Sequence, residues 1–245
     1  MTILAIETSS RQLGIAVSDA NQVAATYELL VSDHPHAIEL PGAVKRLLAS
    51  VGGTLQAMDG FVVDVGPGSF TGLRIGVAFV KALAFTTQKP VVGISSLDVL
   101  AAAVPFTTSW VCPILDAKQK NVYAGLYRLE EAQPLRQIPD FLGPVDAILS
   151  RIQEPVIFLG DGCALYRDRI LQKCPGAQFA PADLWWPRAG TLARLGCKRL
   201  LEGQQDDPSQ LVPRYLYPQD CQVRSADRPT SRLPSPPEIA QPSFY

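Results

Sequence analysis

Residues 3 to 17 read ILAIETSSRQLGIAV, which is two apolar runs joined by a short polar turn. The runs at residues 3 to 6 and 13 to 17 have the length and apolar content of buried strands, and residues 23 to 31 form a third such run. Consecutive strands joined by short turns pair as antiparallel neighbours. The chain is therefore expected to begin with a three-stranded meander.

Helices and strands alternate after the meander. Apolar residues recur at helical spacing after Asp33 and stop at Gly52-Gly53. The remaining predicted elements of the first half are a strand at residues 61 to 65, a helix at 70 to 87, a strand at 91 to 94, and a helix that is capped by Ser95 or Ser96 and runs to residue 104. The predicted order is β-β-β-α-β-α-β-α.

The second half of the chain repeats this order. Its predicted elements are strands at residues 110 to 115, 121 to 129, near Leu135, 156 to 159 and 177 to 180, and helices at residues 144 to 151, 164 to 173 and 188 to 202. In each half the first strand ends on a carboxylate, Glu7 or Asp116, and the second strand contains a glycine, Gly14 or Gly125. The recurrence predicts one fold used twice, in domains at residues 1 to 105 and 106 to 223.

This duplicated order is typical of one α/β architecture. A three-strand meander followed by alternating helices and strands is the ribonuclease-H-like order, and its duplication is the architecture of actin-like ATPases and sugar kinases. We therefore predict an α/β fold of two tandem ribonuclease-H-like domains. Residues 224 to 245 contain five of the 21 prolines and four serines, which predicts a disordered C-terminal tail.

Composition limits the classes of function. The 245 residues are 47% hydrophobic, which is enough for a large core. The 22 Lys and Arg residues are balanced by 23 Asp and Glu residues, for a formal net charge of -1, whereas proteins that hold nucleic acid unaided usually carry a basic excess. The five cysteines are scattered without a Cys-x-x-Cys pair, and neither a signal peptide nor a span of ~20 apolar residues is predicted, so we expect a soluble cytoplasmic protein.

In folds of this class, the two first hairpins face a cleft that holds metal and phosphate. Glu7 and Asp116 could form an acid pair on Mg²⁺ there, or could bond the amides of their own turns. The turns at residues 8 to 12 and 117 to 120 lack the glycine that close approach to phosphate favours. Gly160-Asp161-Gly162 could lie beside an adenine or form a simple strand-to-helix turn. An independent ATP-dependent phosphotransferase or ATPase is therefore an alternative function.

Few residues suit other catalytic chemistry. The two histidines, His34 and His36, are separated only by Pro35 and cannot supply a His-x-x-x-His pair, so no metal site is predicted. Nothing places a histidine beside Ser69 for a catalytic triad, and no catalytic residue is predicted. Trp185-Trp186 is interpreted as packing between domains rather than as a platform for stacked bases.

Residues 66 to 77, GPGSFTGLRIGV, form the densest motif, between a predicted strand and a predicted helix. The motif lacks the Gly-Lys-Ser/Thr of a Walker loop. Two interpretations stay open, which are an anion site at the helix N-terminus and a tight turn that docks the helix closely. The predicted structural loop consists of Gly66, Pro67, Gly68, Ser69, Phe70, Thr71 and Gly72.

The helix that follows this motif has an extensive apolar surface. Between Leu73 and Phe85 only Arg74 and Lys81 are charged, and apolar side chains are spread around the helix. A helix that lies on one sheet normally has a wider polar face. The second domain or another protein must therefore cover its other side, and small residues that permit close approach favour a partner helix.

Several motifs together resemble the TsaB (YeaZ) family. They are Ile3 to Ser9, Gly66 to Gly76, Val92 to Leu97, Asp116-Ala117-Lys118 with Val122-Tyr123, and Pro213 to Leu216. The resemblance runs from residue 1 to about residue 217 and implies an inactive glycoprotease-like paralogue of TsaD. The implied function is a scaffold that supports the catalytic subunit TsaD, together with the ATPase TsaE, when threonylcarbamoyl is installed on the adenosine beside the tRNA anticodon.

The resemblance also implies an interface with TsaD, made largely by the helices at residues 33 to 50 and 70 to 87. The residues expected to contact the partner are Ile38, Pro41, Lys45, Leu73, Arg74, Val77, Ala78, Lys81 and Ala82. No cofactor is expected on the chain alone, and tRNA is expected to be reached through the complex. A nucleotide at the interface with the partner and a homodimer of the isolated chain stay open. The segment His34-Pro35-His36 and Tyr217 depart from the family's usual His-Ser-Glu and arginine.

Overall fold

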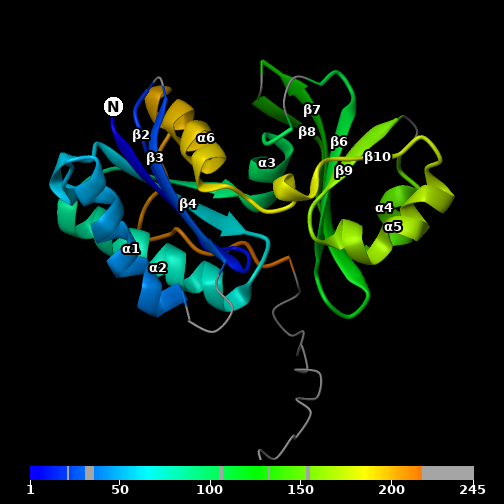
Figure 1. Ribbon diagram of the computed structural model, residues 1–245, viewed down its shortest axis with the longest axis horizontal. Coiled ribbons are helices and arrows are strands. Elements are labelled where there is room, and N and C mark those ends of the chain that lie inside the picture. The colour runs from blue at the N-terminus through cyan, green and yellow to red at the C-terminus, as the bar shows by residue number, and fades with distance from the viewer. Residues whose placement is uncertain (21, 31–35, 105–106, 132, 153–154, 217–245) are drawn as a thin grey trace, which may run out of the picture.

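The computed structural model describes residues 1–20, 22–30, 36–104, 107–131, 133–152 and 155–216. Two five-stranded sheets, each with helices packed on it, lie side by side along the longest axis of the molecule (Figure 1). The predictions for Asp33, His34, Pro35, Tyr217 and the C-terminal tail concern residues outside the described ranges.

The first sheet has the strand order β3-β2-β1-β4-β5. Its strands are β1 (Ile3–Glu7), β2 (Gln12–Ser18), β3 (Val23–Leu30), β4 (Gly60–Gly66) and β5 (Val91–Ser95). The first three form the predicted antiparallel meander, and β4 and β5 are added in parallel on the other side of β1. Every residue of β1, β2 and β4 is buried, because helices cover both faces of this sheet.

The second sheet repeats the first, with the order β10-β9-β6-β7-β8. Its strands are β6 (Trp110–Asp116), β7 (Asn121–Glu130), β8 (Gln133–Pro144), β9 (Val156–Leu159) and β10 (Gln178–Phe179). Each strand has the place of its counterpart in the first half, which confirms the predicted duplication. β8 is longer than the short strand expected near Leu135. It is an edge strand, where Pro134 and Pro139 are tolerated although they weaken the sequence pattern of a strand.

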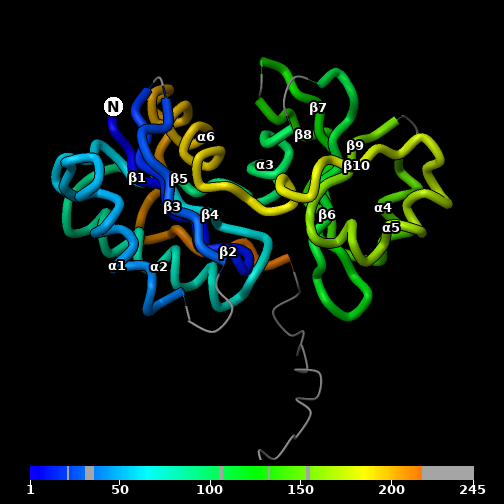
Figure 2. Tube along the Cα trace, in the orientation of Figure 1, coloured from blue at the N-terminus to red at the C-terminus, as the bar shows by residue number. Residues whose placement is uncertain are grey.

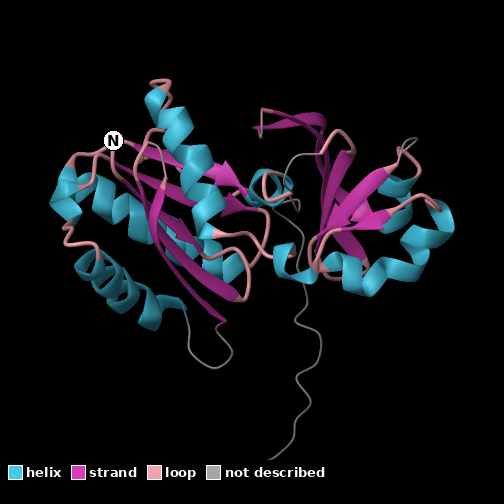
Figure 3. Ribbon diagram, turned by 45° about the horizontal axis from the view of Figure 1, so that its top comes forward, coloured by secondary structure: helices cyan, strands magenta, loops and turns pink. Residues whose placement is uncertain are grey.

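The helices form layers on these sheets. α1 (His36–Ser50) and α2 (Phe70–Thr87) lie on one face of the first sheet, and α6 (Ala189–Leu201) lies on the other (Figure 3). α4 (Val145–Leu149) and α5 (Gly162–Lys173) pack on the second sheet. α3 (Ser96–Ala101) lies between the halves, where Leu97 and Leu100 share a core cluster with Val111 and Tyr127 of the second sheet (Figure 2).

α2 is the one described helix that is long and apolar enough to cross a membrane by length and composition. In this fold 33% of that helix is buried. Its Leu73, Val77 and Val80 side chains lie in the core, and Val77 and Val80 belong to the cluster beneath α1 and α2.

The packing of α6 differs from the predicted domain division. The sequence assigns this helix to the second domain, but Leu192 and Ala193 join Ile3 and Ala5 in one core cluster of the first sheet. α3 has six residues and is too short to cover that face of the sheet, so α6 provides the cover. Leu211 then enters the core beneath α1 and α2, and the packing therefore does not follow a boundary at residues 105 and 106.

Candidate partner-binding site

The glycine-rich loop joins β4 to α2 and lies against the turn between β1 and β2. A β-carbon on Gly68 would be 2.3 Å from the carbonyl oxygen of Ser9, and one on Gly72 would be 2.0 Å from the carbonyl oxygen of Thr8. The Ser69 amide donates a hydrogen bond of 2.6 Å to the Ser9 carbonyl. The Ser69 hydroxyl also caps α2 by accepting from the Gly72 amide at 3.2 Å. The loop is therefore a close-packing device that docks α2, as one of the two predicted interpretations states.

Side chains of the β1–β2 turn bond its own amides. The Ser9 amide donates to Glu7 Oε1 at 2.6 Å, and the Gln12 amide donates to Ser10 Oγ at 3.0 Å. Phosphate binding in a nest of this kind needs amides that point outward and have no other acceptor. These two amides already have acceptors, and the carbonyls of Thr8 and Ser9 face the glycine loop.

Glu7 lies beside Asp64 rather than beside Asp116. Glu7 and Asp64 are both fully buried, at the ends of the parallel neighbours β1 and β4. Burial, and then the charge of Asp64, raises the pKa of Glu7 well above its ordinary value. Burial also raises the pKa of Asp64, although hydrogen bonds to its charged form oppose that shift. The hypothesis of a Glu7–Asp116 pair on Mg²⁺ is therefore wrong in its choice of partner.

Asp116 bonds within its own turn, as the second predicted alternative states. Its Oδ1 accepts from the Lys118 amide at 3.0 Å, and its Oδ2 pairs with Lys118 Nζ at 2.5 Å. Gly160 has φ +104° and packs on β6, where a β-carbon would be 2.3 Å from the Ile114 carbonyl oxygen. The Gly160-Asp161-Gly162 segment thus forms a close strand-to-helix turn. In the described part of the chain, no three His, Cys, Asp or Glu side chains gather as a metal site would require.

The exposed face of α2 presents much of the predicted interface. Arg74, Ala78 and Ala82 are exposed, and Phe70 and Phe85 at the two ends of this face are each 53% exposed. These five residues are called the α2 face below. Leu73 and Val77 are buried, at 1% and 3% exposure, so their prediction as contact residues is wrong. Apolar residues occur all around α2, and the sequence pattern alone did not show which of them face the sheet.

α1 lies beside α2 on the same side of the first sheet (Figures 1 and 3). Its predicted contact residues Ile38, Pro41 and Lys45 are exposed, and Ile38 is 68% exposed. Lys81 of α2 is half-buried instead, because its Nζ donates to the carbonyl oxygens of Ser209 and Leu211 at 3.2 and 3.0 Å. Exposed apolar side chains on two adjacent helices are typical of a protein-binding surface.

Residues 206 to 216, called the C-terminal strap below, extend this surface. The strap crosses the first half, with the Asp206 amide on the Val91 carbonyl at 2.8 Å and the Arg214 amide on the Val65 carbonyl at 2.7 Å. Tyr215 then reaches the α2 face, where its ring lies 5.1 Å from Phe70 and its hydroxyl accepts from Arg74 Nε at 3.0 Å.

Arg74 also lies over the Phe70 ring at 3.9 Å. Tyr215 was not among the predicted contact residues, although the Pro213-Arg214-Tyr215 motif was a signal for it. The aromatic rings and the guanidinium group are suited to a protein interface.

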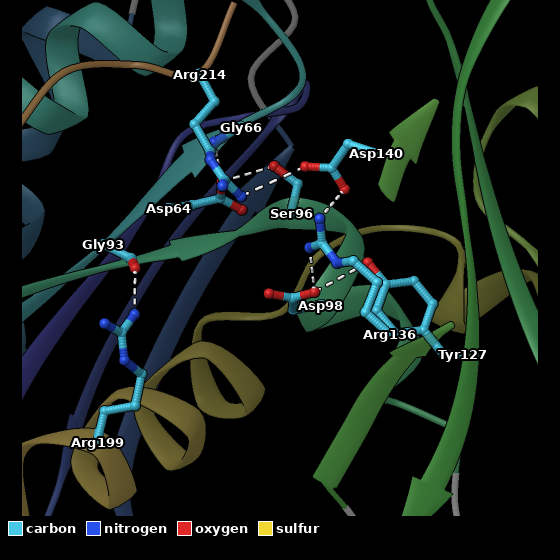
Figure 4. A network of polar contacts seen from close by, with 10 residues as sticks. All are labelled: Asp64, Gly66, Gly93, Ser96, Asp98, Tyr127, Arg136, Asp140, Arg199 and Arg214. Carbon is cyan, nitrogen blue, oxygen red and sulfur yellow. Dashed lines mark hydrogen bonds and ion pairs between the residues drawn. The ribbon is translucent and has the colours of Figure 1, made fainter. Parts of the chain in front are cut away.

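Polar contacts join the two halves at their junction (Figure 4). Arg136 of β8 donates hydrogen bonds to Asp140 on the same strand and to Asp98 on α3. Tyr127 of β7 donates to the same Asp98 oxygen at 2.9 Å. Arg214 of the strap contacts Asp140 at 3.4 Å. Arg136 and Arg214 also border a cavity of about 550 Å³ at this junction.

Trp186 makes a further contact between the halves, because Arg11 of the β1–β2 turn lies 5.3 Å from its ring centre. The Trp185 indole donates to the Ala180 carbonyl at 2.9 Å and joins the clusters of the second half. These contacts agree with the predicted packing between domains.

The fold and sequence have clear relatives. Residues 30–224 match the family model described as TsaD, tRNA N6-adenosine threonylcarbamoyltransferase. The tRNA threonylcarbamoyladenosine biosynthesis protein TsaB of Bacillus subtilis is 36% identical over 220 residues, which covers 88% of this chain and 94% of the relative. TsaB of Escherichia coli is 26% identical over 226 residues, with the same two shares.

Solved structures agree with these relatives. YeaZ from Pseudomonas aeruginosa superposes with a TM-score of 0.75 at 27% identity, over 88% of this chain and 99% of that chain. The ethanolamine utilization protein EutJ from Carboxydothermus hydrogenoformans shares the fold, with a TM-score of 0.50 at 12% identity over 80% of this chain and 90% of that chain.

The class is thus a duplicated ribonuclease-H-like α/β protein of actin-like ATPase architecture, in which glycines dock a helix on the first hairpin. Within that class the chain belongs to the TsaB (YeaZ) family, as its motifs predicted.

Proposed function

We propose that this chain is a non-catalytic scaffold subunit in tRNA threonylcarbamoyladenosine biosynthesis, which binds and supports TsaD and works with TsaE. The printed names of its TsaB relatives support a role in that biosynthesis. The observation that carries the scaffold role is the α2 face, where Phe70 and Phe85 flank two exposed alanines, together with the exposed Ile38 on the adjacent helix α1. Burial of such an exposed apolar surface against a partner protein is energetically favourable.

The chemistry of the first hairpin supports the same proposal. Its turn amides at Ser9 and Gln12 bond side chains of the turn, and Glu7 lies buried against Asp64 instead of facing a cleft. The formal net charge of -1 favours tRNA contact through the assembled complex. A nucleotide held between this chain and TsaD, rather than by this chain alone, is compatible with both observations.

The interface is tested by substituting Ala78→Arg and Ala82→Arg together. Both positions are exposed, so the double variant should fold with unchanged thermal stability while two long charged side chains prevent close approach of TsaD. Co-purification with TsaD should be lost. The matched control is Leu165→Arg on α5, where Leu165 is 63% exposed in the other half and binding should be retained. Undiminished binding by the double variant would contradict this interface.

The scaffold role is tested by reconstitution. Modification of tRNA by TsaD and TsaE should require this chain, and the double variant at Ala78 and Ala82 should fail to support it. Calorimetry of the isolated chain with Mg·ATP tests the alternative. Silence is expected, whereas micromolar binding would favour an independent ATPase or phosphotransferase.

A further inference from the structure

Glu7 and Asp64 are the two fully buried carboxyl groups of the first sheet, and their hydrogen bonds are arranged alike. Glu7 Oε1 accepts from the amide and the hydroxyl of Ser9, both at 2.6 Å. Asp64 Oδ1 accepts from the Gly66 amide at 2.7 Å and from the Ser96 hydroxyl at 2.6 Å. The second oxygen of each group, Glu7 Oε2 and Asp64 Oδ2, has no donor among the described residues.

The strand register brings these two groups together. Ile6 of β1 lies beside Val63 of β4 in the parallel pair, so the next residues along, Glu7 and Asp64, are neighbours at the ends of their strands. The charge of Asp64 also raises the pKa of Glu7, as the charge of a near neighbour does. Two ionised carboxylates on neighbouring, fully buried positions would repel each other strongly, whereas one proton allows a hydrogen bond between them.

The side chains that bond the pair are neutral hydroxyl groups, from the β1–β2 turn and from α3. Ser9 and Ser96 bond the pair, and Thr8 and Ser95, their neighbours in the sequence, are also buried. On α1, burial lowers the pKa of His36 below its ordinary value.

The basic groups of the packed elements are engaged elsewhere. Arg74 bonds Tyr215, and Lys81 bonds carbonyls of the strap. Arg188 beside α6 pairs with Glu28, and Arg214 contacts Asp140. In the described part of the chain, neither carboxyl group of the pair has an ion-pair partner.

We propose that Glu7 and Asp64 hold one proton between them at neutral pH, carried by Glu7, and that this proton keeps the glycine loop docked on the β1–β2 turn. The two carboxyl groups bond the segments that meet there. Glu7 holds Ser9, whose carbonyl accepts from Ser69, and Asp64 holds Gly66 at the start of the loop. Loss of the proton therefore loosens the first turn of α2, which carries Phe70 and Arg74.

The proton makes stability depend on pH in a defined direction. The pKa of Glu7 is raised in the folded chain, whereas the pKa of a glutamate in an unfolded chain is about 4.3. The stabilising contribution is complete below the unfolded pKa and declines as pH rises toward and through the folded pKa. The raised pKa of Asp64 acts in the same direction. This part of the stability should therefore fall from neutral to alkaline pH.

The test compares the full-length chain with its Glu7→Gln variant in denaturant unfolding across pH. The Gln amide can donate to Asp64 but cannot titrate. The unfolding constant of the wild-type chain, divided by that of the variant, should rise about tenfold per pH unit between the unfolded and folded pKa values. The matched control is Glu202→Gln at a side chain with 46% exposure, which should leave the pH slope of the wild type unchanged. Equal slopes for wild type and Glu7→Gln would overturn the proposal.

A second measurement uses the wild-type chain alone and so does not depend on the folding of a variant. In NMR spectra of the wild-type chain, the carboxyl carbon of Glu7 should show the protonated form at pH 7, and the Ser9 and Gly66 amides should titrate with a common midpoint. Hydrogen exchange of the Ser69 amide, corrected for its intrinsic pH dependence, should lose protection as that midpoint is passed. The proposal would be overturned if Glu7 were ionised at pH 7, or if protection of the Ser69 amide did not change as the pH passed the midpoint. Both readouts are independent of TsaD binding.

Discussion

Gly72 has a packing role that no other residue type could fill without movement of the backbone. A β-carbon there would lie 2.0 Å from the Thr8 carbonyl oxygen, and one on Gly76 would lie 2.2 Å from Thr8 Oγ1. Gly68 has the same relation to Ser9. Glycines spaced four residues apart on α2 and its leading loop thus allow the helix to lie directly on the β1–β2 turn.

We predict that Gly72→Ala destabilises the fold by about 1–3 kcal/mol, because overpacking forces the helix or the turn to shift. The measurement is denaturant unfolding of the purified chain. Gly176→Ala is the control, since nothing lies within 4 Å of its β-carbon position, and its unfolding free energy should change by no more than about 0.5 kcal/mol. A Gly72→Ala variant as stable as the control would show that the contact with Thr8 relaxes without cost.

At the scale of elements, the C-terminal strap holds α2 beside the first sheet. Lys81 Nζ donates to two strap carbonyls, at Ser209 and Leu211, and Leu211 lies in the core beneath the helix. Tyr215 then contacts Phe70 and Arg74 on the α2 face. The strap therefore connects a predicted partner surface to the edge of the first sheet.

Removal of the Lys81 charge should release the strap before the rest of the fold. We predict that Lys81→Met lowers the opening free energy of residues 206 to 216 by about 1–2 kcal/mol, because two hydrogen bonds from a charged donor are lost. Hydrogen exchange of the Asp206 and Arg214 amides should then be roughly 5–30 times faster. Lys45→Met, at an exposed position of α1, should leave these amides unaffected. Unchanged protection in Lys81→Met would contradict the role of Lys81.

At the scale of the whole molecule, the relative placement of the two halves depends on α3 and on the polar contacts around it. α3 contributes Leu97 and Leu100 to a core cluster shared with the second sheet. Asp98 on the same helix accepts hydrogen bonds from Arg136 and Tyr127 of that sheet. A short helix of the first half is thus fixed on both its apolar and its polar side by the second half.

Arg136→Met should weaken this junction. Arg136 is about a quarter exposed and its partner Asp140 is 8% exposed. Loss of Arg136 removes the cation that pairs with Asp98 and leaves Asp140 with only its 3.4 Å contact to Arg214. We expect a loss of roughly 1–3 kcal/mol in unfolding free energy, because Asp98 loses its cation and Asp140 loses the nearer of its two. The control is Arg169→Met, whose ion pair with Asp146 is 41% and 49% exposed and should contribute much less to stability. Equal losses in the two variants would show that the junction does not depend on Arg136.

The sequence by itself determined the local elements and their repetition. The apolar strands, the glycine loop and the helix at residues 70 to 87 could be predicted, because periodicity, capping and glycine positions act over a few neighbouring residues. The family motifs were local too. Exposure of Ala78 and Ala82 was also expected from the need for a partner, although the burial of Leu73 and Val77 was not.

Only the tertiary structure decided which distant segments meet. It placed α6 and the C-terminal strap on the first half, paired Glu7 with Asp64 instead of Asp116, and brought Tyr215 to the α2 face. These contacts depend on strand order and on which sheet face still lacks a cover. Both are properties of the folded chain rather than of a short stretch of residues. The hydrophobic effect is non-directional, so an apolar face does not by itself specify which segment will cover it.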